Sequence, residues 1–264
     1  MEFVYSPNNS SRKSKEIICI VLHFTRGGDA DGTVKWLTNP DAKASAHYVV
    51  SRSGKVTQLV KEERAAWHAG SSITKPSLNG VTGLNSRSIG IEICNWGPLF
   101  KAKVDEDVAL ANGGTAKRVE GATYCAARRW TYKYRGPTPE IRHVNTDVIK
   151  NDKHWPGAGH IYLWEPYPKA QIEAILELLK DIVSRYPHIT KEWVTRHQDI
   201  DPTRKIDTGP AFPLDYIFDC LFPHKTEDGV FQVGRRTEDA MSSDEMSDMG
   251  DDRSDKPKKK FCLW

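Results

Sequence analysis

The stretch IICIVL, residues 17–22, decides the fold of this chain. It is a short apolar run rich in β-branched residues, which is typical of a strand buried on both faces in the middle of a sheet. The run is far shorter than the about 20 residues that a membrane-spanning helix requires. His23 follows it directly. An imidazole is therefore expected at the end of a central strand, where functional sites commonly lie.

A second strand is predicted for SIGIEICNWG, residues 88–97. Its isoleucines recur at every second position and therefore share one face of the strand. Gly90, Glu92 and Cys94 share the other face. Glu92 is therefore expected to point away from the isoleucines, toward whatever lies on the opposite side of the sheet.

The rest of the pattern adds helices and further strands. The strongest helix is YPKAQIEAILELLKDIVSRYP (167–187), because its apolar residues repeat with the helical period and prolines stand near both ends. A shorter helix, GTVKWLTN (32–39), ends before Pro40. HYVVSRSGKVTQLV (47–60) predicts a hairpin around a Ser-Gly turn, and WVTRH (193–197) a short strand. We expect an α/β fold, with a central mixed β-sheet flanked by helices in a single domain.

The composition predicts where this domain ends. Residues 1–224 are expected to form it, and residues 225–264 a disordered charged tail. Within the tail, EDAMSSDEMSDMGDD (238–252) is acidic without a base, and RSDKPKKK (253–260) is basic; neither block can bury a core. Residues 97–165 show no sustained period, and we expect loops and short strands of unassigned function there.

Charge and hydropathy exclude several classes of protein. The net charge of +3 is too small to argue for a nucleic-acid partner. The longest apolar run predicts no membrane span. The first residues, MEFVYSPNNSSRKSKE, lack the apolar core of a signal peptide, so we expect a protein that is cytoplasmic at synthesis. We also expect a monomer.

The segment VTRHQDIDPTRKIDTGPAF, residues 194–212, carries the candidate site. His197 and Asp207 stand ten positions apart, and the prolines and glycine between and after them predict a non-helical loop. Such a loop can return the carboxylate to the imidazole. Histidine and aspartate are both residue types that bind zinc, and a catalytic zinc site has three protein ligands. His23 is the best candidate for the third ligand. Spacing alone leaves the alternative open that these side chains form a buried hydrogen-bonded network.

Several separate stretches resemble one family. They are IVLHFT (20–25), SAHYVVSRSGKVTQLV (45–60), AAWHAG (65–70), SIGIEICNWGPL (88–99), YPKAQIEAILELL (167–179) and VTRHQDIDPTRKIDTGPAF (194–212). In this order they resemble the zinc-dependent N-acetylmuramoyl-L-alanine amidases of the amidase type 2 family, which is related to phage lysozyme-amidases and the peptidoglycan recognition proteins. The resemblance covers roughly residues 17–215 and implies their fold.

The resemblance also implies the roles of five residues. His23, His197 and Asp207 match the family's zinc ligands. Glu92 matches the glutamate that acts as general base toward a zinc-activated water and then passes the proton to the leaving amine. Lys205 matches the lysine that stabilises the developing oxyanion. Zn²⁺ is the expected cofactor, and no organic cofactor is implied.

Further positions match groove residues of the family. Tyr48 matches a tyrosine that serves some relatives as an electrophilic aid, although a tyrosine in a strand of the core is an equally good interpretation. His68, Trp67, His47 and Asn95 are expected to bind substrate or to line the groove. For His47 and Asn95, a purely structural role is the alternative.

The implied reaction is hydrolysis of the amide between N-acetylmuramic acid and the L-alanine of the peptidoglycan stem peptide. The elaborations in 97–165 and in the charged tail favour a lytic cell-wall amidase of the phage endolysin type, released to the wall during lysis. One alternative is a cytoplasmic recycling amidase acting on soluble anhydro-muropeptides. A second is a catalytically silent peptidoglycan-binding module, which the full set of ligands, Glu92 and Lys205 disfavours.

Overall fold

The computed structural model separates the chain into two compact units, Met1–Phe212 and Pro213–Trp264. It describes residues 1–70, 80–101, 108–109, 115–116, 124–125, 140–143, 161–201, 205–225 and 231–232. The division after Phe212 falls before the boundary at residue 224 that the composition suggests. Most of the predicted tail lies outside the described residues, so its disorder stays a prediction.

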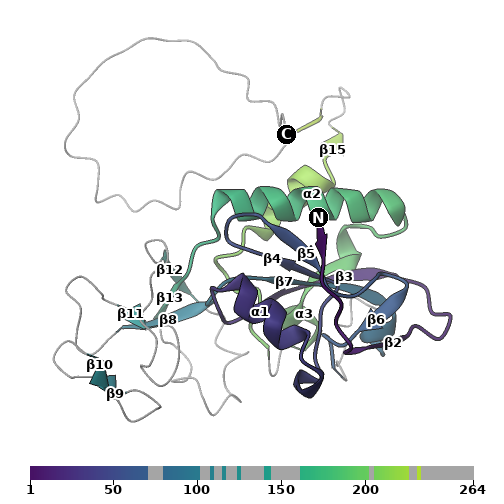
Figure 1. Cartoon of the computed structure of the whole chain (residues 1–264). Helices are drawn as coiled ribbons and strands as arrows, with labels where there is room; N and C mark the ends of the chain where they lie inside the picture. The colour runs from purple at the N-terminus through teal and green to yellow at the C-terminus, as the bar shows by residue number, and fades with distance from the viewer. Residues whose placement is uncertain are drawn as a thin grey trace. The chain divides into compact units, whose positions relative to one another are not determined.

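A six-stranded sheet forms the centre of the first unit. Its strand order is β1 (Glu2–Phe3), β5 (Val56–Gln58), β4 (Tyr48–Val50), β7 (Ser88–Ile93), β3 (Cys19–Phe24) and β14 (Val194–Arg196). Only the β4–β5 hairpin is antiparallel within this sheet, and the other neighbours run parallel. The mixed sheet and the hairpin predicted from sequence are therefore confirmed (Figure 1).

The strand predicted from IICIVL is β3, and all its residues are buried. It lies between two parallel neighbours, β7 and β14. This position explains its continuous apolar character, because helices or loops cover both faces of a parallel strand. In the register of β3 and β7, His23 stands opposite Glu92. Residues paired in this way project from the same face of the sheet.

Helices lie on both faces of the sheet (Figure 1). On one face lies α2 (Lys169–Arg185), within the range predicted from its periodicity. Its buried positions are Gln171, Ile172, Ile175, Leu176, Leu178, Leu179 and Ile182. On the other face lies α1 (Ala30–Leu37), which begins two residues earlier than predicted because Asp29 caps it, accepting the N–H groups of Asp31 and Gly32.

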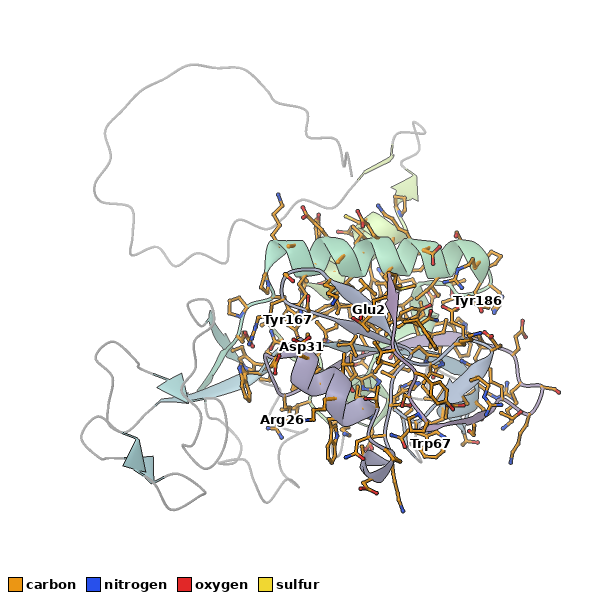
Figure 2. All side chains as sticks on the ribbon, in the orientation of Figure 1. Glu2, Arg26, Asp31, Trp67, Tyr167 and Tyr186 are labelled. Atoms are coloured by element: carbon orange, nitrogen blue, oxygen red, sulfur yellow. The ribbon has the colours of Figure 1, made fainter. Side chains whose placement is uncertain are left out.

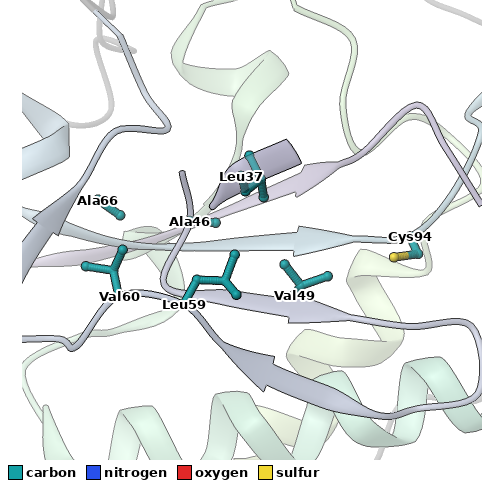
Figure 3. Close-up of a cluster of buried hydrophobic side chains, with 7 residues drawn as sticks. All are labelled: Leu37, Ala46, Val49, Leu59, Val60, Ala66 and Cys94. Carbon is teal, nitrogen blue, oxygen red and sulfur yellow. The ribbon is translucent and has the colours of Figure 1, made fainter. Parts of the chain in front are cut away.

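Two apolar clusters cover the face that carries His23 and Glu92. The first, shown in Figure 3, comprises Leu37, Ala46, Val49, Leu59, Val60, Ala66 and Cys94. The second comprises Cys19, Val21, Ala69, Leu84 and Ile200. His23 follows Val21 of the second cluster by two positions, and Glu92 precedes Cys94 of the first by two. His23 and Glu92 therefore each follow or precede a core residue on the same face of their own strand.

Short elements complete the first unit. They are β2 (Asn9–Ser11), paired with β6 (Arg64–Ala66), the 3₁₀ turns Pro40–Ala42, Leu84–Ser86 and Lys191–Trp193, and, between 98 and 164, β8 (Pro98–Lys101), β9 (Val108–Ala109), β10 (Thr115–Ala116), β11 (Tyr124–Cys125), β12 (Glu140–His143) and β13 (Ile161–Trp164). The short strands expected in 97–165 are thus present, while the intervening residues lie outside the described ranges.

The second unit contains α4 (Leu214–Leu221) and a two-stranded pair, β15 (His224–Lys225) with β16 (Phe231–Gln232). The described positions of the predicted tail, Lys225, Phe231 and Gln232, thus all belong to short strands. Across the described part of the chain, the longest helices fall short of the length and apolarity that crossing a membrane demands.

Candidate metal centre

Three buried side chains converge at one end of the sheet. Nδ1 of His23 lies 2.8 Å from Nδ1 of His197 and 3.2 Å from Oδ2 of Asp207. Nδ1 of His197 lies 3.0 Å from the same Oδ2. The three atoms therefore form a small triangle, and they are the group of potential metal ligands found among the described residues. The structure brings together the three residues that the sequence singled out as ligands.

Parallel pairing of β3 and β14 places the two histidines. Leu22 pairs with Arg196, and each is followed directly by a histidine of the triangle. Because parallel strands end at the same edge of a sheet, the two imidazoles leave the sheet side by side. This juxtaposition links residues that are 174 positions apart in the chain.

The segment after His197 differs from the expected loop. His197–Ile200 forms a short helix, α3, and His197 is its first residue rather than the end of a strand. Asp199 stabilises this turn, because its carboxylate accepts the backbone N–H of Arg196 at 3.3 Å and the guanidinium of Arg196 at 3.0 Å. The prediction of a fully non-helical segment is therefore wrong for these four residues, since a local ion pair supports one helical turn.

Hydrogen bonds return the loop to the histidines. The backbone N–H of Gln198 donates to the carbonyl of Asp207 at 2.8 Å, and its side-chain Oε1 accepts the N–H of Gly209 at 3.0 Å. Gly209 has a φ of +79°, and a Cβ there would lie 2.3 Å from the ring of Trp164. Only glycine meets both requirements. The glycine that the sequence marked as a loop residue therefore fixes the path that brings Asp207 back.

The donor set and spacing fit a zinc ion. Two imidazole nitrogens and one carboxylate oxygen, with a fourth position left open, make a typical catalytic zinc site. Ligand bonds of about 2.0–2.1 Å in a tetrahedron put the ligand atoms about 3.3 Å apart, and the edges of the triangle are 2.8–3.2 Å. The ligand atoms need to separate by only a few tenths of an ångström.

Electrostatics hold these groups in the forms that bind a metal. Burial, followed by the proximity of His197, lowers the pKa of His23 to about 4, so the imidazole is neutral at neutral pH. Burial alone would raise the pKa of Asp207, but hydrogen bonds from His197 and His23 outweigh it and hold that pKa well below its usual value. A neutral imidazole and an ionised carboxylate are the species that ligate metals.

Glu92 is paired across neighbouring strands with one residue of this triangle. It stands opposite His23 in the pairing of β7 with β3, on the face that the strand alternation predicts. Its Oε2 is buried and has no hydrogen-bond partner among the described residues. Burial, followed by the negative charge of Asp207, raises the pKa of Glu92 to about 8, while Lys205 acts in the opposite direction. Glu92 is therefore poised to exchange a proton near neutral pH.

Lys205 lies close enough for its charge to act on the site. Its backbone N–H donates to the carbonyl of Asp201 at 2.9 Å, so a backbone hydrogen bond joins Lys205 to the residue that follows α3. The positive charge lowers the pKa of both Glu92 and His23. The role that the family resemblance gives Lys205, stabilising an oxyanion, stays a prediction.

Tyr48 does not join the cluster. Its hydroxyl donates to Oε1 of Glu62 at 2.6 Å, on the face of the sheet covered by α2. The physical reason is strand register, because Tyr48 pairs with Ile91 of β7 and so shares the isoleucine face, opposite Glu92. The structure therefore favours the core interpretation of Tyr48 over a catalytic one.

His68 is brought directly against a predicted ligand. Its Nδ1 lies 3.0 Å from Nε2 of His23, on the side of that ring away from the triangle. The ring of His68 also lies edge-on to that of His23, with centroids 5.1 Å apart. A role limited to lining a groove does not account for this contact.

The other three predicted groove residues use their polar atoms within the protein. His47 is fully buried, and its Nδ1 accepts a backbone N–H of β7 at 2.9 Å. The side-chain amide of Asn95, also buried, donates to the carbonyl of Glu165 at 3.2 Å. The half-buried Trp67, labelled in Figure 2, donates its indole N–H to the hydroxyl of Ser10 at 3.2 Å. The structure supports the structural alternative for His47 and Asn95.

Sequence reasoning missed the partners of His68. Oγ of Ser88 lies 3.0 Å from Nε2 of His68, and Oδ1 of Asn85 accepts the backbone N–H groups of His68 and Ala69. One signal was available, because Ser88 shares the alternation of Gly90 and Glu92 and therefore the face of the site. No local pattern pointed to Asn85.

In this α/β fold two histidines at the ends of neighbouring parallel strands meet an aspartate from a returning loop, which defines a protein with a candidate metal centre. The chain belongs to the N-acetylmuramoyl-L-alanine amidase family, which it matches over residues 13–210. This range contains the triangle, Glu92, Lys205 and His68.

Individual relatives are similar over part of their length. The chain is 31% identical over 205 residues to the N-acetylmuramoyl-L-alanine amidase AmiD of Escherichia coli K12, covering 75% of this chain and 51% of AmiD. It is 45% identical over 168 residues to the 1,6-anhydro-N-acetylmuramyl-L-alanine amidase AmpD of Enterobacter cloacae, covering 64% of this chain and 52% of AmpD. The chain thus spans about half the length of these relatives.

A solved structure shows a partial likeness. It is a complex of E. coli AmiD with the substrate anhydro-N-acetylmuramic acid-L-Ala-D-gamma-Glu-L-Lys, and its TM-score is 0.49 at 28% identity. The match covers 80% of this chain and 58% of that one.

Proposed function

We propose that this chain is a zinc-dependent N-acetylmuramoyl-L-alanine amidase that hydrolyses the amide between N-acetylmuramic acid and the L-alanine of a peptidoglycan stem peptide. One observation carries the proposal: three ligand atoms converge within hydrogen-bonding distances of one another. Opposite one of them in the sheet stands Glu92, whose buried Oε2 has no hydrogen-bond partner among the described residues. Membership of the amidase family supports the bond that is cleaved.

The proposed ligands are Nδ1 of His23, Nδ1 of His197 and a carboxylate oxygen of Asp207. Zinc bound there supplies a Lewis acid and a water of lowered pKa. The protein's contribution is to hold the ligand atoms together before the ion arrives. The β3–β14 pairing and the Gln198–Asp207 contact do this through backbone hydrogen bonds.

Glu92 and Lys205 are the proposed catalytic side chains. Glu92 takes a proton from the attacking water and then donates it to the leaving amine, and a carboxyl with a pKa of about 8 can do both near neutral pH. Lys205 offers an ammonium to the carbonyl oxygen as that atom gains negative charge, an interaction that strengthens in the transition state. This proposal gives the hydroxyl of Tyr48 no catalytic role, because that hydroxyl donates a hydrogen bond to Glu62.

The proposed substrate is a soluble anhydro-muropeptide rather than the intact wall. The sequence favoured a lytic enzyme, but the named relatives support the alternative. AmpD is named as a 1,6-anhydro-N-acetylmuramyl-L-alanine amidase, and AmiD is described with an anhydro-N-acetylmuramic acid peptide as substrate. Both descriptions name the anhydro sugar, which favours recycling of wall fragments as the setting.

One digestion series tests these proposals. The purified protein is given soluble anhydro-muropeptides and, separately, intact sacculi, each with and without a chelator, and released stem peptide is quantified. We expect chelator-sensitive release from the anhydro-muropeptides that far exceeds release from sacculi. Faster release from sacculi supports the lytic alternative, and absence of cleavage of either substrate by the zinc-loaded protein supports the silent binding module.

A further inference from the structure

A chain of hydrogen bonds leads away from the back of the metal triangle. Nε2 of His23 lies 3.0 Å from Nδ1 of His68, and Nε2 of His68 lies 3.0 Å from Oγ of Ser88. The hydroxyl of Ser88 then donates to the carbonyl of Leu84 at 2.6 Å. The chain thus runs through two imidazoles and one hydroxyl and ends on a backbone carbonyl.

The carbonyl at its end sets the direction of every proton in this chain. A carbonyl oxygen only accepts, so the single O–H of Ser88 is used on Leu84. Oγ of Ser88 must then accept a proton from Nε2–H of His68. A neutral imidazole carries one N–H, so Nδ1 of His68 accepts in turn from Nε2–H of His23.

This order of donors determines the tautomer of His23. With its proton on Nε2, the ring presents an unprotonated Nδ1, which is the atom that lies 2.8 Å from His197 and 3.2 Å from Asp207. A metal ligand needs that lone pair. The opposite tautomer places a proton where the ion binds.

The structure also restrains His68 independently of His23. Oδ1 of Asn85 accepts the backbone N–H groups of His68 at 3.0 Å and of Ala69 at 2.7 Å, which fixes the backbone below the ring. The ring itself lies over Gly90, where a Cβ would come within 2.4 Å of Cγ of His68. The absence of a side chain at Gly90 thus provides the space that the ring occupies.

We infer that His68, supported by Ser88, is a positioning residue that orients His23 and fixes its Nε2–H tautomer for metal binding. This inference rests on the proposed zinc site. His197 provides a contrast within the same site, because its Nε2 is buried without a hydrogen-bond partner among the described residues. Among the described residues, the hydrogen bond to the second ring nitrogen is therefore present for His23 and missing for His197.

The test compares zinc affinities of full-length variants. His68→Leu keeps a similar volume but removes the acceptor, whereas His68→Asn returns an amide oxygen near the position of Nδ1. We expect the zinc dissociation constant, measured by competition with a chelator, to rise about ten- to a hundredfold in His68→Leu. His68→Asn recovers most of that loss. His188→Leu removes a histidine remote from the site and is the matched control, with an unchanged constant.

A second variant tests the chain without altering either imidazole. Ser88→Ala removes the acceptor of His68 and frees its tautomer, so we expect a smaller rise in the dissociation constant, about threefold to tenfold. This variant decides the question if circular dichroism shows that His68→Leu is not folded. In the zinc-loaded wild type, the Nε2–H proton of His23 is expected as a resolved imidazole resonance that is lost in folded His68→Leu and kept in His188→Leu.

Two results overturn the inference in different ways. Wild-type zinc affinity in folded His68→Leu or in Ser88→Ala, with only KM increased, shows that His68 lines the substrate groove. Failure of the wild type itself to bind zinc removes the proposed metal site, and the inference with it.

Discussion

Two glutamates on opposite faces of the sheet, the buried Glu62 and the half-buried Glu92, have opposite surroundings. On the α2 face, Oε1 of Glu62 accepts hydrogen bonds from Tyr48 at 2.6 Å and Arg185 at 3.0 Å, and Oε2 accepts from Tyr186 at 3.0 Å and also from Arg185. Figure 2 labels Tyr186 at the end of α2. On the other face, Oε2 of Glu92 is buried and has no hydrogen-bond partner in the part of the chain that the structure describes.

The pKa values follow these surroundings. Burial would raise the pKa of Glu62, but hydrogen bonds from Arg185 and Tyr48 outweigh it, and the pKa lies below its usual value. Burial raises the pKa of Glu92 to about 8. A carboxylate that stabilises the fold is surrounded by donors, whereas one kept for proton transfer has an unsatisfied oxygen. The comparison separates a glutamate held by structural hydrogen bonds from the glutamate proposed for proton transfer.

The largest expected effect comes from Glu92→Gln. We expect hydrolysis of anhydro-muropeptides to fall by about 10²–10⁴-fold, because the amide cannot transfer the proton. Bound zinc, measured by elemental analysis, should remain at the wild-type level. Asp207→Ala is the matched variant, expected to lose the metal as well as the activity. Equal loss of metal in both variants would remove the assigned role of Glu92.

Glu62→Gln should reverse this pattern. The variant leaves the guanidinium of Arg185 without its charged partner, and we expect the free energy of unfolding to fall by about 1–3 kcal/mol. The effect stays below that of a fully buried ion pair because the side chain of Arg185 is 40% exposed. Urea denaturation measures the loss, and kcat per folded molecule should be unchanged. A kcat reduced as strongly as in Glu92→Gln would contradict the division between the two faces.

Acid should remove the contribution of Glu62. Its folded-state pKa lies below the unfolded value of about 4.3, so the contribution is fully present above that pH and is lost as the pH falls through the folded-state pKa. The difference in unfolding free energy between wild type and Glu62→Gln should therefore shrink below about pH 4. Urea titrations at several pH values test this, and a constant difference down to pH values well below the unfolded pKa would show that the charge of Glu62 is not involved.

The smallest effect is expected for Tyr48→Phe. Removing one hydrogen bond to Glu62 should cost about 1 kcal/mol of stability, while the other donors of that carboxylate remain. The values of kcat and KM should equal those of the wild type. A strong fall in kcat, with zinc retained, would restore the electrophilic role that the family resemblance suggested for Tyr48.

Local patterns predicted much of what positions the site. The apolar run before His23 predicted a central strand, and alternation in 88–97 placed Glu92 on the face opposite the isoleucines. Both hold because side-chain direction in a strand depends only on backbone geometry. The pairing of β4 with β7 places Tyr48 on the face of the isoleucines, away from Glu92. Sequence alone did not predict this, because the register of two strands is not readable from either strand by itself.

The sequence by itself determined the candidate ligands, the strand faces and the long helix, because periodicity and residue chemistry are local properties. Only the tertiary structure decided that α3 begins at His197, that Tyr48 binds Glu62 and that His68 supports His23. These outcomes depend on which surfaces meet when distant segments pack together. The shortest contact of the metal triangle joins residues 174 positions apart, and no local pattern encodes such a distance.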